Sequence, residues 1–120
     1  MANGPQNPVV HLELHTPDVG AACSFFTRLC GWEPQRIDPG YERYRSIEVG
    51  EEIGGSVVQC AAGRPLWIPY VEVGSVARAT ERAGRLGAAV LLEPREGPAG
   101  CRSVVASPAG GELAFWQPKE

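Results

Sequence analysis

Apolar residues recur at helical spacing in two segments of the chain, and each segment follows a short apolar run. In the first segment the apolar stripe comprises Val19, Ala22, Cys23, Phe26, Leu29 and Cys30. In the second segment, 57 residues further along, the same six places hold Val76, Ala79, Thr80, Ala83, Leu86 and Gly87. Two matching stripes at one fixed shift indicate an internal repeat with one amphipathic helix in each copy.

The residues that border the two stripes predict where the helices begin and end. Thr16 is expected to cap the first helix, with Pro17 in its first turn, and Ser75 is expected to cap the second. Gly31 and Gly87 are expected to end the two helices.

Short runs with strand character surround each helix, and turn-forming Gly and Pro residues separate them. In the first copy the predicted strands are Val9–Leu14, Glu33–Ile37, Tyr41–Val49 and Gly55–Cys60. In the second copy they are Trp67–Val73, Ala88–Glu93, Arg102–Ala106 and Glu112–Gln117. Each copy therefore has the order strand, helix and three strands.

This order predicts an α+β fold built from two βαβββ half-modules, at about residues 8–60 and 66–118, within a single domain spanning 4–120. A half-module of this size cannot bury both faces of its sheet. We therefore expect an open, barrel-like mixed sheet with the helices outside. The concave surface inside it is the natural place for a ligand.

Composition and charge exclude several classes of protein. The chain has 120 residues, 43% hydrophobic and 21% charged, which is typical of one folded domain. The net charge of -3 and the scattered basic residues argue against nucleic acid as a partner. No apolar stretch is long enough to cross a bilayer and no signal peptide is recognisable, so a cytoplasmic protein without a membrane partner is expected.

The four cysteines form no C-x-x-C pair, which makes a disulfide framework unexpected. We interpret them as small buried or half-buried thiols. The alternative is a catalytic cysteine, for which Cys101 beside Arg102 is the candidate.

Three motifs together resemble the vicinal oxygen chelate superfamily, which includes glyoxalases, bleomycin resistance proteins and extradiol dioxygenases. They are the opening strand at 10–14, the helix end at 25–32 and the turn at 107–113 before the closing strand. The resemblance covers nearly the whole chain and implies the paired-module fold. It implies much less about the chemistry, because one fold supports many functions.

The resemblance also implies where a metal would be bound: metal-using members place one His, Glu or Gln on the first and last strand of each half. His11 matches the first of these positions, and the others fall at Ile68, at Ala114 and at Val57 or Val58, with Gln59 only if the register slips. Neither Ile nor Ala has a lone pair to offer, so no metal or other cofactor is expected. A relocated divalent ion is left open. Strand alternation sends His11, Glu13 and His15 to one face and Ile68, Tyr70 and Glu72 to the matching face.

Candidate site residues follow from these faces and from the aromatic residues near strand ends. His11, Glu13 and Glu72 are the catalytic candidates; Gln59, Trp67, Tyr70 and Trp116 are the ligand-binding candidates. The alternatives are a solvated sheet face for the polar residues and a subunit interface for the tryptophans. Arg45 on the third strand is either part of a solvated surface or an anion clamp.

The leading hypothesis is a glyoxalase-like protein that binds a small, partly aromatic molecule in the concave cavity without the family metal. The alternative is a lyase or isomerase that uses His11 with Glu13 or Glu72, with or without a divalent metal. A third hypothesis is a domain that only mediates interactions. A homodimer is expected under all three, because an open sheet leaves edges that a second copy can cover.

Overall fold

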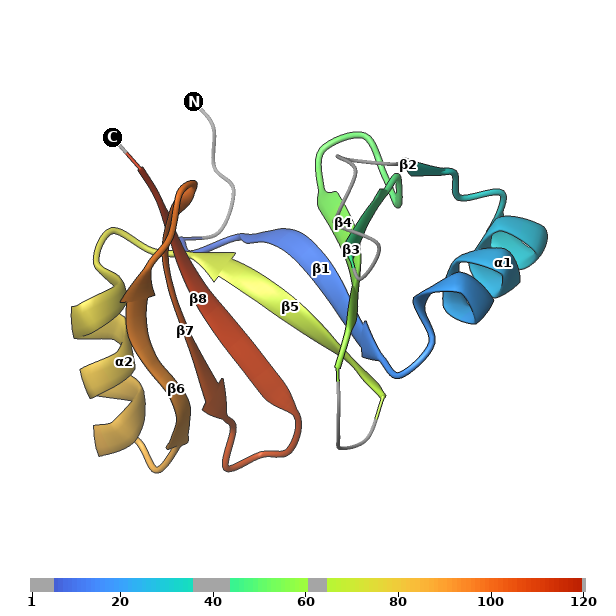
Figure 1. Ribbon diagram of the computed structural model, residues 1–120. Coiled ribbons are helices and arrows are strands. Elements are labelled where there is room, and N and C mark those ends of the chain that lie inside the picture. Colours follow the sequence, from blue (N-terminus) through green and yellow to red (C-terminus); the bar gives the residue numbers. More distant parts are fainter. Residues whose placement is uncertain (1–5, 36–43, 61–64, 120) are drawn as a thin grey trace. The chain divides into compact units, whose positions relative to one another are not determined.

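The computed structural model describes residues 6–35, 44–60 and 65–119 and divides the chain into two compact units (Figure 1). The first unit comprises His11–Ile68. The second unit comprises Pro69–Glu120 together with the residues before His11. Each unit contains one helix and the strands of one predicted module.

The first unit is a mixed sheet with strand order β2-β3-β4-β1. Strand β1 runs parallel to β4, and β3 runs antiparallel to both β4 and β2. The elements are β1 (Val9–Thr16), α1 (Val19–Cys30), β2 (Pro34–Gln35), β3 (Tyr44–Ile47) and β4 (Gly54–Gln59).

Helix α1 begins two residues later than predicted. Asp18 is the N-cap, and its carboxylate accepts a hydrogen bond from the Ala21 N–H at 2.9 Å. Thr16 is still in β1, and its hydroxyl instead accepts from the Asp18 N–H at 3.2 Å. The predicted stop at Gly31 is confirmed, because this residue caps the helix with φ at 74°, a conformation that glycine adopts without strain.

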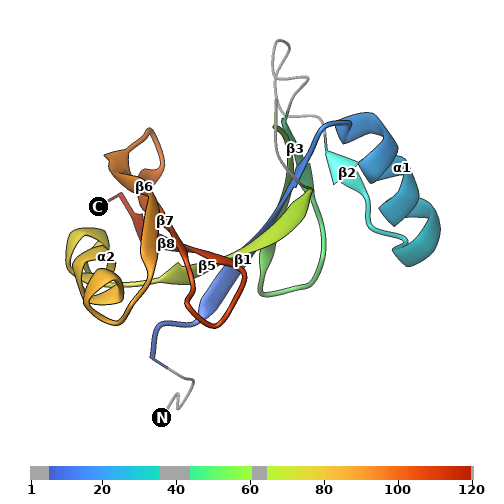
Figure 2. The ribbon, with the colours of Figure 1, turned by 90° about the horizontal axis from the view of Figure 1, so that it is seen from below.

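Helix α1 covers one face of this sheet, and the core of the unit lies between them (Figure 2). The buried core residues are Leu14, Val19, Cys23, Ile47 and Val57. Full burial of an aliphatic side chain such as Ile47 contributes about 1.5–3 kcal/mol to the free energy of unfolding.

The second unit repeats this plan with strand order β5-β8-β7-β6. Strand β5 is parallel to β8, and β7 is antiparallel to β8 and β6. The elements are β5 (Leu66–Glu72), α2 (Val76–Arg85), β6 (Ala89–Glu96), β7 (Gly100–Ala106) and β8 (Glu112–Pro118).

The predicted cap of α2 is confirmed: the Ser75 hydroxyl accepts from the Arg78 N–H at 3.2 Å. Helix α2 packs on β6, β7 and β8. Its contact includes a buried polar pair, because the Thr80 hydroxyl lies 2.6 Å from both the Ser103 hydroxyl and the Val76 carbonyl oxygen. The helix ends at Arg85, and Gly87 follows with φ at 102°.

The predicted fold class is confirmed: the chain is α+β with two βαβββ modules. Some details of the elements differ from the prediction. The apolar stripes are buried only near the helix starts, because Leu29 and Leu86 are 66% and 69% exposed. Strand β7 also begins earlier than predicted, at Gly100. Of the helices in the described ranges, none is long and apolar enough to span a bilayer.

Candidate functional site

In each unit, the sheet face turned away from the helix carries the polar residues. In β1 and β4, Leu14 and Val57 point toward α1, so their neighbours Glu13 and Ser56 point the other way. We call this surface the face opposite α1; its residues are His11, Glu13, His15, Tyr44 and Ser56. The face opposite α2 is defined in the same way, because Ser103 points toward Thr80; its residues are Tyr70, Glu72, Arg95, Arg102, Ala114 and Trp116.

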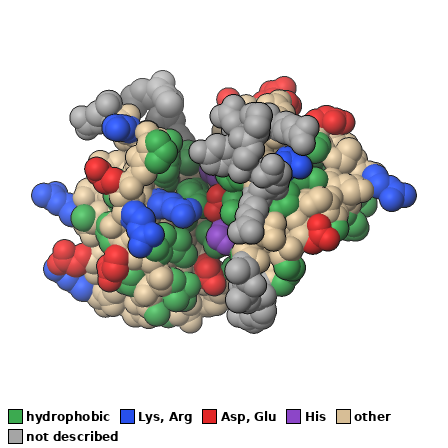
Figure 3. Space-filling model, in the orientation of Figure 1, with side chains coloured by type: hydrophobic (Ala, Val, Ile, Leu, Met, Phe, Trp, Pro, Cys, Tyr) green, Lys and Arg blue, Asp and Glu red, His purple; other side chains and the backbone are tan. Residues whose placement is uncertain are grey.

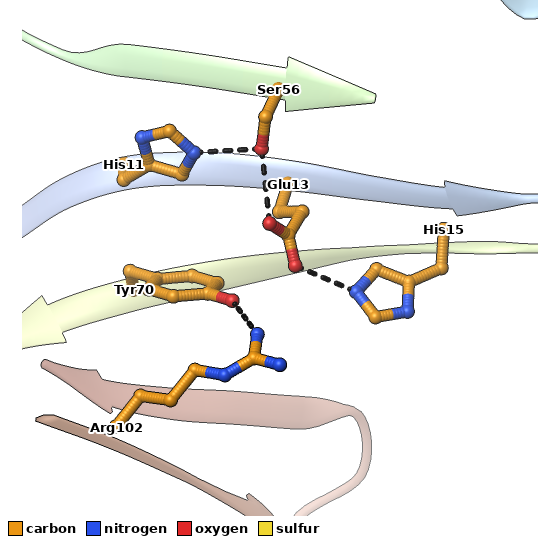
Figure 4. A network of polar contacts seen from close by, with 6 residues as sticks. All are labelled: His11, Glu13, His15, Ser56, Tyr70 and Arg102. Carbon is orange, nitrogen blue, oxygen red and sulfur yellow. Dashed lines mark hydrogen bonds and ion pairs between the residues drawn. The ribbon is translucent and has the colours of Figure 1, made fainter. Parts of the chain in front are cut away.

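The face opposite α1 contains a continuous hydrogen-bonded chain of four side chains (Figure 4). Nε2 of His11 lies 2.8 Å from Oγ of Ser56, and Ser56 donates to Oε2 of Glu13 at 3.1 Å. Oε1 of Glu13 in turn lies 2.8 Å from Nε2 of His15. Glu13 is 7% exposed and Ser56 is fully buried, so this is a built polar cluster and not a solvated strand face. The predicted pairing of His11 with Glu13 is thus indirect, through Ser56.

The hydrogen-bond directions determine the tautomer of His11. Ser56 has a single hydroxyl hydrogen, and that hydrogen is donated to Glu13. The Ser56 oxygen must therefore accept from His11, which requires the proton on Nε2. In the neutral imidazole, Nδ1 is then the basic nitrogen.

Burial lowers the pKa of His11 below its ordinary value, and the nearby Glu13 carboxylate opposes this only in part. The imidazole is consequently neutral at pH 7. A neutral imidazole with its lone pair on Nδ1 can accept a proton or a hydrogen bond there.

Gly54 makes room for the His11 ring. The two residues are partners across β1 and β4, and a Cβ at residue 54 would lie 2.6 Å from Nδ1 of His11. No side chain fits at that distance unless the imidazole moves. The absence of a side chain at Gly54 therefore lets the His11 ring lie close to β4.

Tyr44 and Ser56 belong to this cluster but were not among the predicted site residues. Burial raises the pKa of Tyr44, the Glu13 carboxylate raises it further, and a side-chain hydrogen bond with Ser56 opposes the rise. The alternation of β3 was interpreted as a solvated surface. Pairing of Tyr44 with Val58 places it on the face opposite α1, whereas Arg45 pairs with Val57 and lies on the side of the helix.

The face opposite α2 has a different chemistry. Nη1 of Arg102 donates to the Tyr70 hydroxyl at 2.8 Å (Figure 4). Tyr70 is 6% exposed, whereas Arg102 is exposed. Tyr70 pairs with Ala114 and Arg102 pairs with Trp116, so these residues share one side of the sheet. Arg102 is a further residue that the sequence did not single out for binding.

The remaining candidates are spread over the two units. Glu72 is exposed and pairs with Trp116, which is half-buried. Gln59 is exposed at the end of β4, opposite Thr16. The Trp67 ring lies in an aromatic group of the first unit, 5.4 Å from Phe26 and 6.2 Å from Trp32 between ring centroids. Packing therefore accounts for Trp67 without a ligand.

Sequence comparison finds relatives named for small-molecule metabolism. The chain is 25% identical over 123 residues to the anthracycline biosynthesis protein DnrV of Streptomyces peucetius, covering 88% of this chain and 45% of the relative. It is also 25% identical over 114 residues to the putative glyoxylase CFP32 of Mycobacterium bovis, covering 88% and 44%. The chain thus spans less than half the length of these curated relatives. No family model matches it.

Solved structures share the fold at low sequence identity. A glyoxalase/bleomycin resistance protein/dioxygenase superfamily member from Vibrio splendidus 12B01 has a TM-score of 0.66 at 18% identity, covering 93% of this chain and 99% of that one. Methylmalonyl-CoA epimerase from Mycobacterium tuberculosis has a TM-score of 0.65 at 14% identity, covering 100% and 93%. The chain has the fold of the vicinal oxygen chelate superfamily. Its glyoxalase-like architecture is therefore established, while its ligand and reaction are not.

The register of the two modules corrects one of the positions at which this superfamily would bind a metal. Ala114 pairs with Tyr70, and in the first unit the same place, opposite Glu13, is held by Ser56. The assignment to Val57 or Val58 was therefore wrong, and Val57 lies in the core beneath α1. The shift of 57 residues that relates the two helices takes Ala114 to Val57, one residue beyond the Ser56 position that the strand register gives.

The side chains at these positions do not fit a metal-binding set. Ile68 and Ala114 have no donor atoms, and Nε2 of His11 is engaged by Ser56. Within the part of the chain that the structure describes, no three His, Cys, Asp or Glu side chains are grouped to hold a metal ion.

Proposed function

We propose that this glyoxalase-like domain binds a small, partly aromatic molecule on a sheet face opposite a helix, without the metal ion used by metal-dependent members of the superfamily. The observation that supports this proposal is the partly buried chain His11–Ser56–Glu13–His15, in which His11 and Ser56 stand at the two places of the first unit where metal ligands would be expected and lie 2.8 Å apart. Buried polar groups of this kind fix the orientation of a ligand in an otherwise apolar site.

Aromatic side chains support the same proposal. Trp116 and Tyr70 lie on the face opposite α2 and offer flat apolar surface with a polar edge. The name of the relative DnrV is in keeping with an aromatic ligand, since it refers to the biosynthesis of anthracyclines, which are polycyclic aromatic compounds. Trp67 contributes less, because its ring is packed against Phe26.

A ligand screen tests this proposal. Thermal unfolding is measured with a panel of planar aromatic natural products, and metal content is measured on protein purified without chelators. We expect at least one compound to raise Tm in the metal-free protein and to lose this effect in Ser56→Ala. The matched control is Ser103→Ala, which removes an equally buried hydroxyl beneath α2. A stoichiometric metal, or a panel without any stabilising compound, would contradict the proposal.

Acid–base catalysis is the second candidate, and the state of His11 favours it. Its pKa is lowered by burial and its basic nitrogen is Nδ1, so it can remove a proton from a bound molecule at neutral pH. The chain to Ser56 and Glu13 would hold the ring in place during transfer. An isomerisation or elimination needs such a base and no cofactor.

Turnover separates the two candidates. For an isomerase or lyase, solvent deuterium is incorporated into a substrate, His11→Gln abolishes this incorporation, and Glu72→Gln leaves most of it because Glu72 is exposed in the other unit. For a binding protein, ligands bind without any deuterium exchange.

Homodimer formation and a cytoplasmic location remain predictions. Size-exclusion chromatography at micromolar concentration tests whether the protein is a homodimer.

A further inference from the structure

We propose that the outer face of α1 binds the same face of a second copy of this chain, with the two helices antiparallel and related by a twofold axis. The outer face of α1 consists of five exposed residues that lie on one side of the helix: Asp18, Ala21, Phe25, Arg28 and Leu29. All of them belong to the first unit. This inference goes beyond the proposed function and does not depend on it.

The outer face of α1 exposes large apolar side chains. Phe25 is 57% exposed and Leu29 is 66% exposed. Together with Ala21 they recur every four residues, so they form one continuous stripe along the helix. Hydrophobic, acidic and basic side chains all reach the surface on the side of the first unit that carries α1 (Figure 3). Single exposed apolar residues are ordinary, but a contiguous stripe on a helix marks an interaction surface.

Helix α2 shows which residues the same module carries on a helix face in water. The shift of 57 residues places Arg78 and Arg82 of α2 where α1 has Ala21 and Phe25. Both arginines are exposed. The fold therefore does not require apolar residues at these places, because one module has charged residues there. A partner that covers α1 accounts for the difference.

The order of sizes and charges along the outer face identifies this partner as a second copy. An antiparallel pair of α1 helices centred on Cys23 places Ala21 opposite Phe25 of the second copy, so a small residue meets a large one. It also places Asp18 opposite Arg28 of the second copy, so opposite charges meet. The twofold axis repeats both matches. A face that matches itself in this way is a requirement of a twofold interface.

The charged residues at the two ends of α1 can form the expected ion pairs without loss of helix capping. Oδ1 of Asp18 accepts from the Ala21 N–H at 2.9 Å, and the second carboxylate oxygen can accept from a guanidinium. Arg28 lies in the last turn of the helix. Antiparallel helix dipoles add a favourable interaction, because the positive end of each lies beside the negative end of the other. The ion pairs set the orientation, and the apolar stripe supplies most of the affinity.

Sedimentation equilibrium of the full chain tests the interface. The concentration is varied over roughly 1–500 μM, because a contact confined to one helix face is small and should be weak. Phe25→Ser and Leu29→Ser are each expected to raise the dimer Kd about tenfold or more. The matched control is Leu86→Ser, which removes a leucine of similar exposure, 69%, from the corresponding place of α2 and should leave Kd unchanged.

A substitution that favours the helix separates association from folding. Ala21→Gln adds bulk at an exposed position of the first turn, where Gln is a favourable residue. We expect this variant to keep the Tm of the wild-type monomer and to raise the dimer Kd. The test therefore remains decisive if Phe25→Ser fails to fold.

Charge substitutions test the orientation of the helices. Asp18→Asn keeps a good N-cap residue and removes the charge, so an antiparallel dimer should be weakened about threefold at low salt. Arg28→Gln should have a similar effect, and the two losses should not add in the double variant, because each removes the same ion pair. In a parallel pair the Asp18 side chains of the two copies would meet, and Asp18→Asn would lower Kd instead.

Three results would overturn this inference. A chain that stays monomeric over the whole range has no such interface, and its α1 face then belongs to solvent or to another partner. A dimer with unchanged Kd in Phe25→Ser, Leu29→Ser and Ala21→Gln forms through a different surface. A lower Kd in Asp18→Asn contradicts the antiparallel arrangement. None of these results bears on the ligand panel with Ser56→Ala, which decides the proposed function separately.

Discussion

The two faces opposite the helices occupy the same place in two copies of one module, yet they carry different chemistry. Glu13 faces Ser56 across β1 and β4, and Tyr70 faces Ala114 across the corresponding strands of the second unit. Tyr44 and Arg102 also correspond. Tyr44 pairs with Val58, two residues after Ser56 on β4, and Arg102 pairs with Trp116, two residues after Ala114 on β8. The register is shared, so only the side chains differ.

The difference concerns how polar groups are satisfied. On the face opposite α1, a carboxylate, a hydroxyl and two imidazoles form a continuous hydrogen-bonded chain. On the face opposite α2, one arginine is held by a tyrosine and a second arginine lies beside it. The first arrangement is suited to holding a proton donor or acceptor in place, whereas the second keeps basic side chains at the surface. A repeated backbone can thus support two different chemistries in one chain.

Among substitutions on the two faces, removal of the Ser56 hydroxyl is expected to lower the free energy of unfolding most. Ser56→Ala takes a donor from the buried Glu13 carboxylate and an acceptor from His11, which should lower the free energy of unfolding by about 2–3 kcal/mol. Urea unfolding measures this. Ser103→Ala is the control, and it should cost less because Thr80 keeps its bond to Val76. Equal losses in the two variants would contradict a special role for the Ser56 chain.

A Cβ at Gly54 is expected to have the next largest effect. Gly54→Ala places a methyl group 2.6 Å from Nδ1 of His11, and the ring must move, at a cost of about 1–2 kcal/mol. The control is Gly84→Ala in α2, where no atom lies within 4 Å of the added Cβ. Alanine has the higher helix propensity, so this variant should be more stable by up to about 1 kcal/mol. The NMR signals of His11 should shift in the first variant only. Unshifted signals with unchanged stability would refute the close approach.

The repeat, the helix positions and the fold class could be predicted from the sequence, because apolar periodicity and turn residues are local signals. Val76 is fully buried and Ser75 caps its helix as expected. The N-cap of α1 could not be predicted in the same way, because Thr16 and Asp18 are both favourable N-cap residues. Strand β1 extends through Thr16, so the helix begins after it and Asp18 is the N-cap.

Site residues were predicted only where strand alternation on β1 and β5 was clear. Ser56 escaped detection because register depends on the pairing of distant strands, and the two modules differ by one residue before β4 and β8. Arg95 and Arg102 are seven residues apart across a hairpin with register shifts, so their direct opposition has no periodic signal in the sequence. Such cross-strand neighbours require coordinates.

A smaller effect is expected from pH, and it distinguishes the first face from the second. Burial lowers the pKa of His11, so the unfolded chain binds more protons than the folded one between the folded pKa and about 6.5. Stability should therefore be full above about pH 6.5 and decrease as the pH falls through that window, by roughly 1.4 kcal/mol for each unit of lowering. His11→Gln should reduce this slope in unfolding measured from pH 7 to 5. An unchanged slope would place the pKa of His11 near its ordinary value.

The smallest effect on stability is expected from the second face. Tyr70→Phe removes the acceptor for Arg102, but the exposed guanidinium can bond to water instead, so the loss should be about 0.5–1 kcal/mol. Tyr44→Phe is the matched variant at a half-buried tyrosine of the first unit. Broader or averaged NMR signals of the Arg102 guanidinium in Tyr70→Phe, but not in Tyr44→Phe, would show that Tyr70 orients this arginine. If the Arg102 signals are the same in both variants, the Tyr70 hydroxyl does not restrict the Arg102 side chain.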